Sequence, residues 1–273
     1  MFNSLFGGMP PVVKNLLIIN ALMLLGSFVL ESSFNYDLTQ TLGLHSMQSE
    51  YFKPFQFVTH MFMHANFMHL FFNMYALWMF GKILEMVWGG KRFLFYYLVT
   101  GLGAAALHMF ISWIEMSSFI NEANAFISSP NPDLFYTLVK SHAPEFKKNI
   151  VDFVTAWSAN PTDSSYSTEA ITFVERLISE TRNVPTVGAS GAVYGVLLAF
   201  GMMFPNTPLM LLFIPVPIKA KYFVIGFGLI ELFSGLSNSP GDNVAHFAHL
   251  GGMLFGFILI KFWWKKRNDN FMM

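Results

Sequence analysis

The 273-residue sequence contains no cysteine and little charge. Without cysteine, the chain can have no disulfide bond, no thiolate metal site and no cysteine nucleophile. Only 12% of its residues are charged, whereas 54% are hydrophobic and the mean hydropathy is +0.48. This composition is wrong for a soluble enzyme and typical of a polytopic membrane protein. Any chemistry must therefore come from serine, histidine, acids or amides.

Six segments are apolar over about 20 residues, the length that a transmembrane helix needs. They are residues 12–31, 66–87, 93–114, 187–204, 221–237 and 244–264. The first has no small-residue cleavage pattern, so we expect a helix that stays in the protein rather than a signal peptide. The short apolar stretch 210–216 lies among prolines and predicts a loop or re-entrant segment. We expect an all-α, six-helix membrane protein.

Lysine and arginine are distributed unevenly between the two sides of this topology. The short loops of one side hold only Lys53, and the other side collects Lys14, Lys82, Lys91, Arg92, Lys219, Lys221, Lys261, Lys265, Lys266 and Arg267. Basic residues accumulate on the cytoplasmic side, so we expect both termini there. The formal net charge of zero hides this asymmetry and gives no support to a nucleic-acid partner.

A polar insert interrupts the membrane segments. We divide the chain into a membrane core, residues 1–114 and 185–273, and an extracytoplasmic insert at 115–184. Two stretches of the insert repeat apolar residues at helical spacing: Phe146, Ile150, Phe153, Val154 and Trp157 in one, Ile171, Val174, Leu177 and Ile178 in the other. We expect two or three amphipathic helices, packed together or lying along the bilayer surface.

Three polar residues occupy equivalent places on alternate spans. With six spans and a cytoplasmic N-terminus, the second, fourth and sixth helices all begin on the extracytoplasmic side. His69, Ser190 and His249 lie within the first turn or two of these helices, so a rise of about 1.5 Å per residue puts them at similar depth. Polar side chains there are costly unless they face a cavity or a partner. The alternative is a structural hydrogen bond between helices.

Small residues favour close contact between the fourth and sixth helices. Glycines are spaced four apart on both: Gly191 with Gly195, and Gly252 with Gly256. This spacing lets two helix backbones approach closely. Because His249 shares a face with the second pair, we expect its imidazole to reach Ser190.

Such a pair has the chemistry of a serine hydrolase. The imidazole takes the serine proton during attack on a carbonyl and returns it to the leaving amine. We see no good candidate for an orienting acid, since Asp242 lies in the preceding loop and Glu231 on the fifth helix. The sequence therefore predicts a Ser190–His249 dyad. Tyr194, one turn below the serine, either stacks on the histidine ring or is a core aromatic.

The developing oxyanion needs hydrogen-bond donors. The start of the fourth helix offers unpaired backbone N–H groups and the positive end of the helix dipole. His69 and Asn73 are four residues apart on one face of the second helix, so they can add an imidazole and an amide N–H. The alternative is a satisfied structural pair.

At these residues the chain resembles the rhomboid intramembrane serine proteases. The matching elements are Gly188-Ala189-Ser190-Gly191 with Tyr194, His69 and Asn73 within residues 64–73, and Ala248-His249-Leu250-Gly251-Gly252 followed by Gly256. The resemblance covers about residues 12–114 and 185–265. Each motif alone is weak, but the three in this order on six spans are specific.

The resemblance implies roles for these residues. Ser190 would be the nucleophile and His249 the general base, while His69, Asn73, Gly188 and the Ser190 backbone N–H would stabilise the oxyanion or substrate. The family cuts membrane proteins in or near a transmembrane segment, commonly beside a small residue. It implies a lipid bilayer as surroundings and membrane proteins as substrates. We expect no cofactor and no metal, and the oligomeric state is left open.

The chain departs from many rhomboids in two places. Their loop after the first helix carries a Trp-Arg pair, but residues 32–58 contain neither residue type. The insert is also larger than the family core requires. Because it leads directly into Gly188 and Ser190, one hypothesis is that it covers the site or screens substrates. The other is a decorative or partner-binding loop.

Competing functions need other patterns. A zinc site is not predicted, since neither His60, His64 and His69 nor His246 and His249 form a His-Glu-x-x-His motif or have a neighbouring acid. A transporter would need ionisable groups at the midplane, and the nearest ones, His108 and Glu231, are read as helix-packing hydrogen bonders. The remaining alternative is a catalytically silent rhomboid-like factor that binds membrane proteins or acts in their quality control.

A peptide entering from lipid requires a movable element. We expect the gate to be the fifth helix together with the loop before the sixth, where Pro240 and Gly241 mark flexible backbone.

Overall fold

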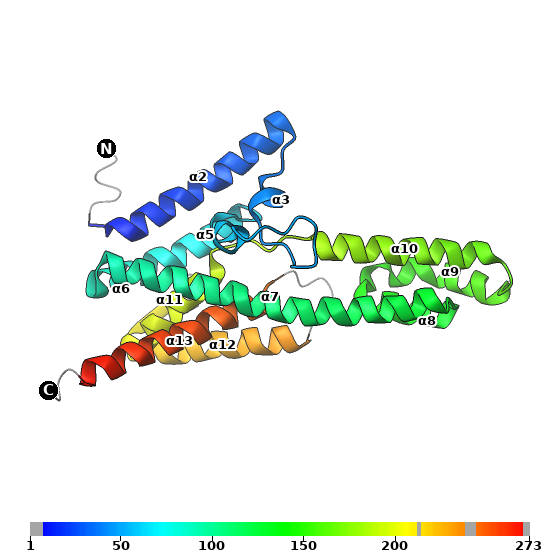
Figure 1. Cartoon of the computed structure of the whole chain (residues 1–273). Coiled ribbons are helices and arrows are strands. Elements are labelled where there is room, and N and C mark those ends of the chain that lie inside the picture. Colours follow the sequence, from blue (N-terminus) through cyan, green and yellow to red (C-terminus); the bar gives the residue numbers. More distant parts are fainter. Residues whose placement is uncertain (1–7, 212–213, 238–243, 270–273) are drawn as a thin grey trace.

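The computed structural model describes residues 8–211, 214–237 and 244–269. Helices make up most of this part of the chain, as predicted (Figure 1). The membrane core contains α2 (Pro11–Phe34), α5 (Phe67–Ala76) with α6 (Lys82–Trp88), α7 (Gly90–Ser128), α11 (Ser190–Met203), α12 (Ala220–Ser237) and α13 (His246–Asp269). A π-helical stretch at Leu77–Gly81 joins α5 to α6 as one rod.

Five of the described helices are long and apolar enough to cross a membrane. Among the six core segments, α11 is too short to cross. Its 14 residues measure about 21 Å, whereas the hydrocarbon layer is about 30 Å thick. The predicted fourth span began at residue 187, but the helix begins at Ser190 because the residues before it are extended. The short helix places its own N-terminus inside the bundle rather than at its surface.

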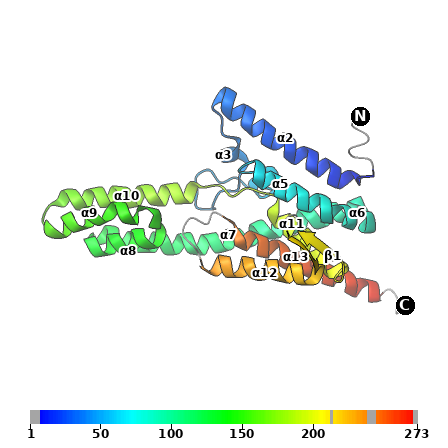
Figure 2. The ribbon, with the colours of Figure 1, turned by 180° about the vertical axis from the view of Figure 1, so that it is seen from behind.

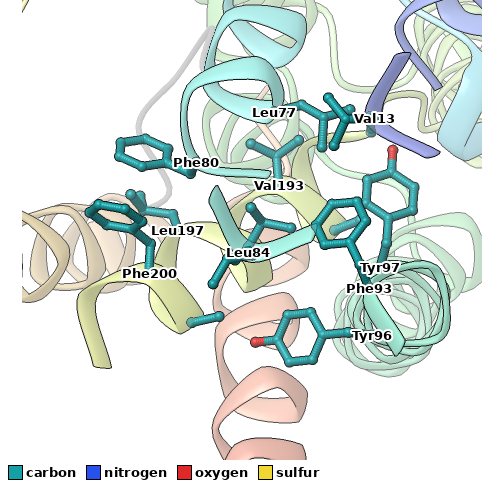
Figure 3. Packing of buried hydrophobic residues seen from close by; sticks show 14 of the residues in the cluster. Val13, Leu77, Phe80, Leu84, Phe93, Tyr96, Tyr97, Val193, Leu197 and Phe200 are labelled. Carbon is teal, nitrogen blue, oxygen red and sulfur yellow. The ribbon is translucent and has the colours of Figure 1, made fainter. Parts of the chain in front are cut away.

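The first loop carries small helical pieces. It contains α3 (Leu38–Leu42), α4 (Gln56–Thr59) and a 3₁₀ turn at His60–Phe62. A cluster of buried apolar side chains from α2, the π-helical stretch, α6, α7 and α11 fills the centre of the bundle (Figure 3). The figure labels Val13, Leu77, Phe80, Leu84, Phe93, Tyr96, Tyr97, Val193, Leu197 and Phe200.

Glycines on α11 and α13 replace side chains where the two backbones meet. A Cβ added to Gly252 would collide with the backbone carbonyl of Gly191. One turn further on, a Cβ on Gly256 would lie 3.4 Å from the Cα of Gly195 and would clash with the hydroxyl of Tyr96. That hydroxyl donates to the Gly195 carbonyl at 2.8 Å. The contact between helices is therefore a contact between backbones.

Glu85 of α6 holds the start of α2. Its carboxylate is 3% exposed and accepts from the backbone N–H of Val12 at 2.9 Å and of Val13 at 2.7 Å. The first N–H groups of a helix have no partner within the helix. A buried carboxylate satisfies them here and complements the helix dipole.

The insert is a helical bundle that continues from the core. The predicted third span ended at residue 114, but α7 runs on to Ser128, since no glycine or proline interrupts residues 115–128. It packs with α8 (Pro132–His142), α9 (Lys147–Ala159), which follows a 3₁₀ turn at Pro144–Phe146, and α10 (Ser164–Asn183). Both views show the insert extending in line with α7, away from the chain termini (Figures 1 and 2).

The insert has a core of its own. The end of α7 contributes Phe119 and Phe126, which pack with Phe135 and Val139 of α8. The predicted amphipathic faces of α9 and α10 close this core, and Trp157 and Val174 are among their buried residues. Of the two arrangements expected from the sequence, the structure has the packed one.

The apolar stretch at 210–216 takes part in a hairpin. Strand β1 (Pro208–Leu211) pairs antiparallel with β2 (Ile214–Lys219), with Leu209 opposite Ile218. The expected loop or re-entrant segment is thus a short β-hairpin that links α11 to α12.

The backbone contact predicts different effects for two Gly→Ala substitutions. Gly252→Ala should destabilise the protein by about 1–3 kcal/mol, because the added methyl overpacks against Gly191. Gly226→Ala on α12 is the matched control, since a Cβ there meets nothing within 4 Å and alanine favours the helix by about 1 kcal/mol. Thermal unfolding in detergent micelles measures both. Equal melting temperatures for the two variants would contradict the backbone contact.

Candidate active site

Ser190 is the first residue of α11 and is positioned by the extended segment before it. In this segment Thr186 pairs with Leu44 through two backbone hydrogen bonds of 2.9 Å. The N–H of Gly188 donates to the carbonyl of His60, also at 2.9 Å. The first loop thus fixes the point at which the chain turns into the helix.

Gly188 is required at this turn for two reasons. Its φ of +132° is a conformation that residues with a side chain rarely adopt. A Cβ would also lie 2.8 Å from Cε1 and 2.9 Å from Nε2 of the His69 ring. The glycine therefore lets the backbone pass directly beside His69, two residues before Ser190.

The structure brings Ser190 and His249 together. Nε2 of His249 lies 2.8 Å from Oγ of Ser190, within hydrogen-bond distance. His249 is the fourth residue of α13 and is 8% exposed, and Ser190 is half-buried. The backbone contact between Gly191 and Gly252 sets this distance, because each glycine lies within one turn of one partner.

Tyr194 stacks on the histidine ring. The ring centroids of Tyr194 and His249 are 4.1 Å apart, with an angle of 8° between the planes. The tyrosine hydroxyl donates to Oε1 of Glu231. Tyr194 thus contacts the histidine from α11 and is itself held from α12.

Glu231 is the residue that the sequence analysis missed. Its Oε2 lies 2.9 Å from Nδ1 of His249 and 2.6 Å from Nδ1 of His246. The expectation that no acid approaches His249 is therefore wrong. The carboxylate comes from a different helix, so residue spacing around His249 could not reveal it. The available signal was the presence of an ionisable residue in an apolar span.

The histidine pair of α13 and Glu231 also form a group that could be considered as a metal site. Glu231, His246 and His249 form a group whose ligand atoms lie within 4.8 Å of one another, so the histidine pair does have a neighbouring acid. Ligand atoms around a tetrahedral zinc ion are about 3.3 Å apart. The contacts of 2.6 and 2.9 Å from the two histidines to a single carboxylate oxygen are shorter than this spacing.

His69 lies beside Gly188, and Asn73 follows it one turn further along α5. Nδ1 of His69 accepts from the backbone N–H of Ala65 at 3.4 Å, so the neutral ring carries its proton on Nε2, the atom beside Gly188. Asn73 is buried, and its Nδ2 donates to the carbonyl of His69 at 2.9 Å. One of the two amide protons is thus used within α5.

Gln56 and His60 organise the first loop, which has no Trp-Arg pair. The Gln56 side chain accepts from the N–H of His45 and of Lys53 and donates to the carbonyls of Thr41 and Tyr51. His60 Nδ1 lies 2.8 Å from the carbonyl of Gln56. Burial lowers the pKa of His60 to about 4, so this ring is neutral at pH 7. These contacts support the residue that holds Gly188.

Comparison with known proteins shows the family of the chain. Residues 51–117 and 165–266, more than half of the chain, match the rhomboid domain family. The chain belongs to the rhomboid family. The residues left unmatched between the two ranges, 118–164, fall in the insert. With several long apolar helices, this rhomboid is an integral multi-pass membrane protein.

A similar protein occurs in Schizosaccharomyces pombe. It is described as an uncharacterized mitochondrial rhomboid protein and is 28% identical over 219 residues. The alignment covers 77% of this rhomboid and 52% of the yeast protein. The chain therefore spans about half the length of the curated relative that it matches.

Part of the predicted gate lies outside the described residues. Pro240, Gly241 and Asp242 belong to the stretch between the end of α12 and residue 244. The predictions made for them stay predictions.

The buried His60 predicts that stability falls in acid. Its pKa is about 4 in the folded protein and near 6.5 when unfolded, so the unfolded chain binds more protons between these values. The contribution of the neutral His60 ring to the free energy of unfolding is complete above pH 6.5 and is lost as the pH falls toward 4. Between pH 7 and 5 the loss is about 2 kcal/mol.

Thermal unfolding of wild type and His60→Gln at pH 7 and pH 5 measures this effect. His60→Gln should be less stable than wild type at pH 7. Its free energy of unfolding should fall less than that of wild type between pH 7 and pH 5. The same acid-induced loss in both proteins would contradict a buried, neutral His60.

Proposed function

We propose that this rhomboid is an intramembrane serine endopeptidase that cleaves membrane proteins in or beside a transmembrane segment. The observation that carries the proposal is the 2.8 Å contact between Ser190 Oγ and His249 Nε2. A serine and a histidine at this distance form a nucleophile with its general base. Family membership supports the same class of activity.

The reaction follows from this pair. Ser190 Oγ attacks the carbonyl carbon of the scissile peptide, and its proton passes to Nε2 of His249. When the C–N bond breaks, His249 returns the proton to the leaving amine. A water molecule then attacks the acyl carbon with His249 again as base, which releases the new carboxyl end and restores the serine.

The oxyanion would lie between the start of α11 and His69. The N–H groups of the first residues of α11 have no acceptor within the helix, and they carry the positive end of its dipole. Nε2–H of His69 lies beside Gly188 and adds a donor from α5. The second amide proton of Asn73 is a further donor. Such donors stabilise the negative oxygen of the tetrahedral intermediate.

A substrate helix would approach from the lipid on the side of α12. The buried residues of α12 are only Ala220, Val224 and Glu231, and a whole face of this helix, including Ile225, Leu229 and Phe233, is exposed in the described protein. By contrast, α11 is buried along most of its length. We infer that α12 moves aside, as expected from the sequence for this part of the gate.

We infer that the site opens toward the extracytoplasmic side. The start of α2, the turn between α6 and α7 and the start of α12 carry basic residues and lie at the end of the bundle away from the insert (Figures 1 and 2). Basic ends favour the cytoplasmic side. Ser190 begins a helix at the other end, where the insert joins the core. The insert remains a candidate for covering this site or screening substrates.

Reaction with a fluorophosphonate probe and cleavage of a tethered transmembrane reporter test the proposal. Wild type should react and cleave, and Ser190→Ala should lose both activities by more than about 10³-fold, since no other group replaces the nucleophile. Ser27→Ala is the matched control. Its hydroxyl lies in the membrane helix α2 and donates to Met23, far from the site.

A folded wild type that neither reacts nor cleaves any reporter would contradict the proposal. It would favour a catalytically silent rhomboid that binds membrane proteins.

A further inference from the structure

We propose that Glu231 is a positioning residue for His249, which makes the site a Ser-His-Glu arrangement whose acid is carried by α12, the helix proposed above as the gate. This inference rests on the proposed protease function and goes beyond it. It adds a group that holds the general base in its working form. It also connects the tautomer of His249 to the position of α12.

The carboxylate joins three helices at the site. Oε1 accepts from the hydroxyl of Tyr194 on α11, and Oε2 contacts Nδ1 of His246 and Nδ1 of His249 on α13. Glu231 is 6% exposed. A buried carboxylate is costly unless hydrogen-bond donors surround it. Tyr194 and His246 supply such donors, and the ring of His249 adds a close electrostatic contact.

The carboxylate determines which tautomer of His249 is favoured. An ionised carboxylate only accepts hydrogen bonds, so the Nδ1 atom beside it is stabilised when it carries the proton. Nε2 then has a free lone pair directed at Ser190 Oγ, as a general base requires. The contact to Nδ1 is 2.9 Å but not linear, so its effect is mainly electrostatic, and it grows when the ring becomes charged during attack.

The same contacts hold α12 in place. Of its buried residues, Ala220 and Val224 lie near its start, and Glu231 is the one close to the site. Movement of this half of α12 into the lipid would take the carboxylate away from Tyr194, His246 and His249 together. The histidine would therefore be held in its working tautomer when α12 is closed and would lose that support when α12 opens.

Glu231→Gln separates positioning from packing. Glutamine keeps the shape and can still accept from Tyr194, but its amide then donates toward Nδ1 of His249 and favours the opposite tautomer. We expect kcat to fall by about 10²–10⁴-fold with KM changed less than about threefold, as when an orienting carboxylate becomes an amide in a soluble serine protease. The rate of fluorophosphonate labelling should fall by the same factor, with little change in melting temperature.

Glu85→Gln is the matched control, because Glu85 is also buried but caps α2 far from the site. It should lower the melting temperature and leave kcat of the folded protein unchanged. Glu231→Leu is a second variant that keeps the volume but cannot accept a hydrogen bond, and it should also lose kcat. ¹⁵N NMR of the His249 ring gives a direct reading. The proton should reside on Nδ1 in wild type and on Nε2 in Glu231→Gln.

Wild-type kcat in folded Glu231→Gln and Glu231→Leu would overturn the inference. So would an unchanged His249 tautomer, or a loss of activity explained entirely by reduced folding. The proposed function is judged separately, by wild type against Ser190→Ala. If wild type cleaves and the Glu231 variants cleave equally well, the protease proposal stands and the role of Glu231 falls.

Discussion

The site depends on one contact, the approach of the α11 and α13 backbones at Gly191 and Gly252. No side chain separates the helices there, and the next turn repeats the arrangement with Gly195 and Gly256. Hydrophobic burial gives little drive for helix association in lipid, so close packing and hydrogen bonds must provide it. The glycines allow this packing, and the short distance between Ser190 and His249 follows from it.

Two buried carboxylates inside the apolar bundle have partners on other helices. Glu85 and Glu231 illustrate two uses of a buried carboxylate. Glu85 accepts from backbone N–H groups at the start of α2, so its role is to complete a helix end. Glu231 accepts from side chains that surround Ser190, so its role concerns the chemistry of the site. Glu85 and Glu231 are buried to a similar extent, so their different roles follow from their hydrogen-bond partners.

Much of the architecture could be predicted from the sequence. Hydropathy located the five described helices that are long enough to cross a membrane and the shorter apolar helix α11. The alternation of helix direction was enough to expect His69, Ser190 and His249 at one level. The predicted third span stopped at residue 114 because the scan followed apolar character, whereas α7 continues as an amphipathic helix into the insert. Helix α11 begins late because Gly188 at φ +132° ends an extended segment. That backbone state is fixed by tertiary contacts with His60 and His69.

Glu231 marks the limit of reasoning from spacing. Its position on an apolar helix indicated importance, but its partners lie on two other helices, and the rotation of α12 decides whether it faces them or the lipid. Similarly, the absence of a Trp-Arg pair from the first loop did not predict that Gln56 would organise the loop through four hydrogen bonds. The contacts of Glu231 and those of Gln56 both form only when separate segments come together in the fold.

The most direct measurement is an experimental structure of the protein after reaction with a fluorophosphonate. The account predicts phosphorus bonded to Ser190 Oγ, the phosphoryl oxygen within hydrogen-bond distance of the Ser190 N–H and His69 Nε2, and His249 beside the serine oxygen. Phosphorus on another residue, or a layer of packed side chains between Ser190 and His249, would contradict it.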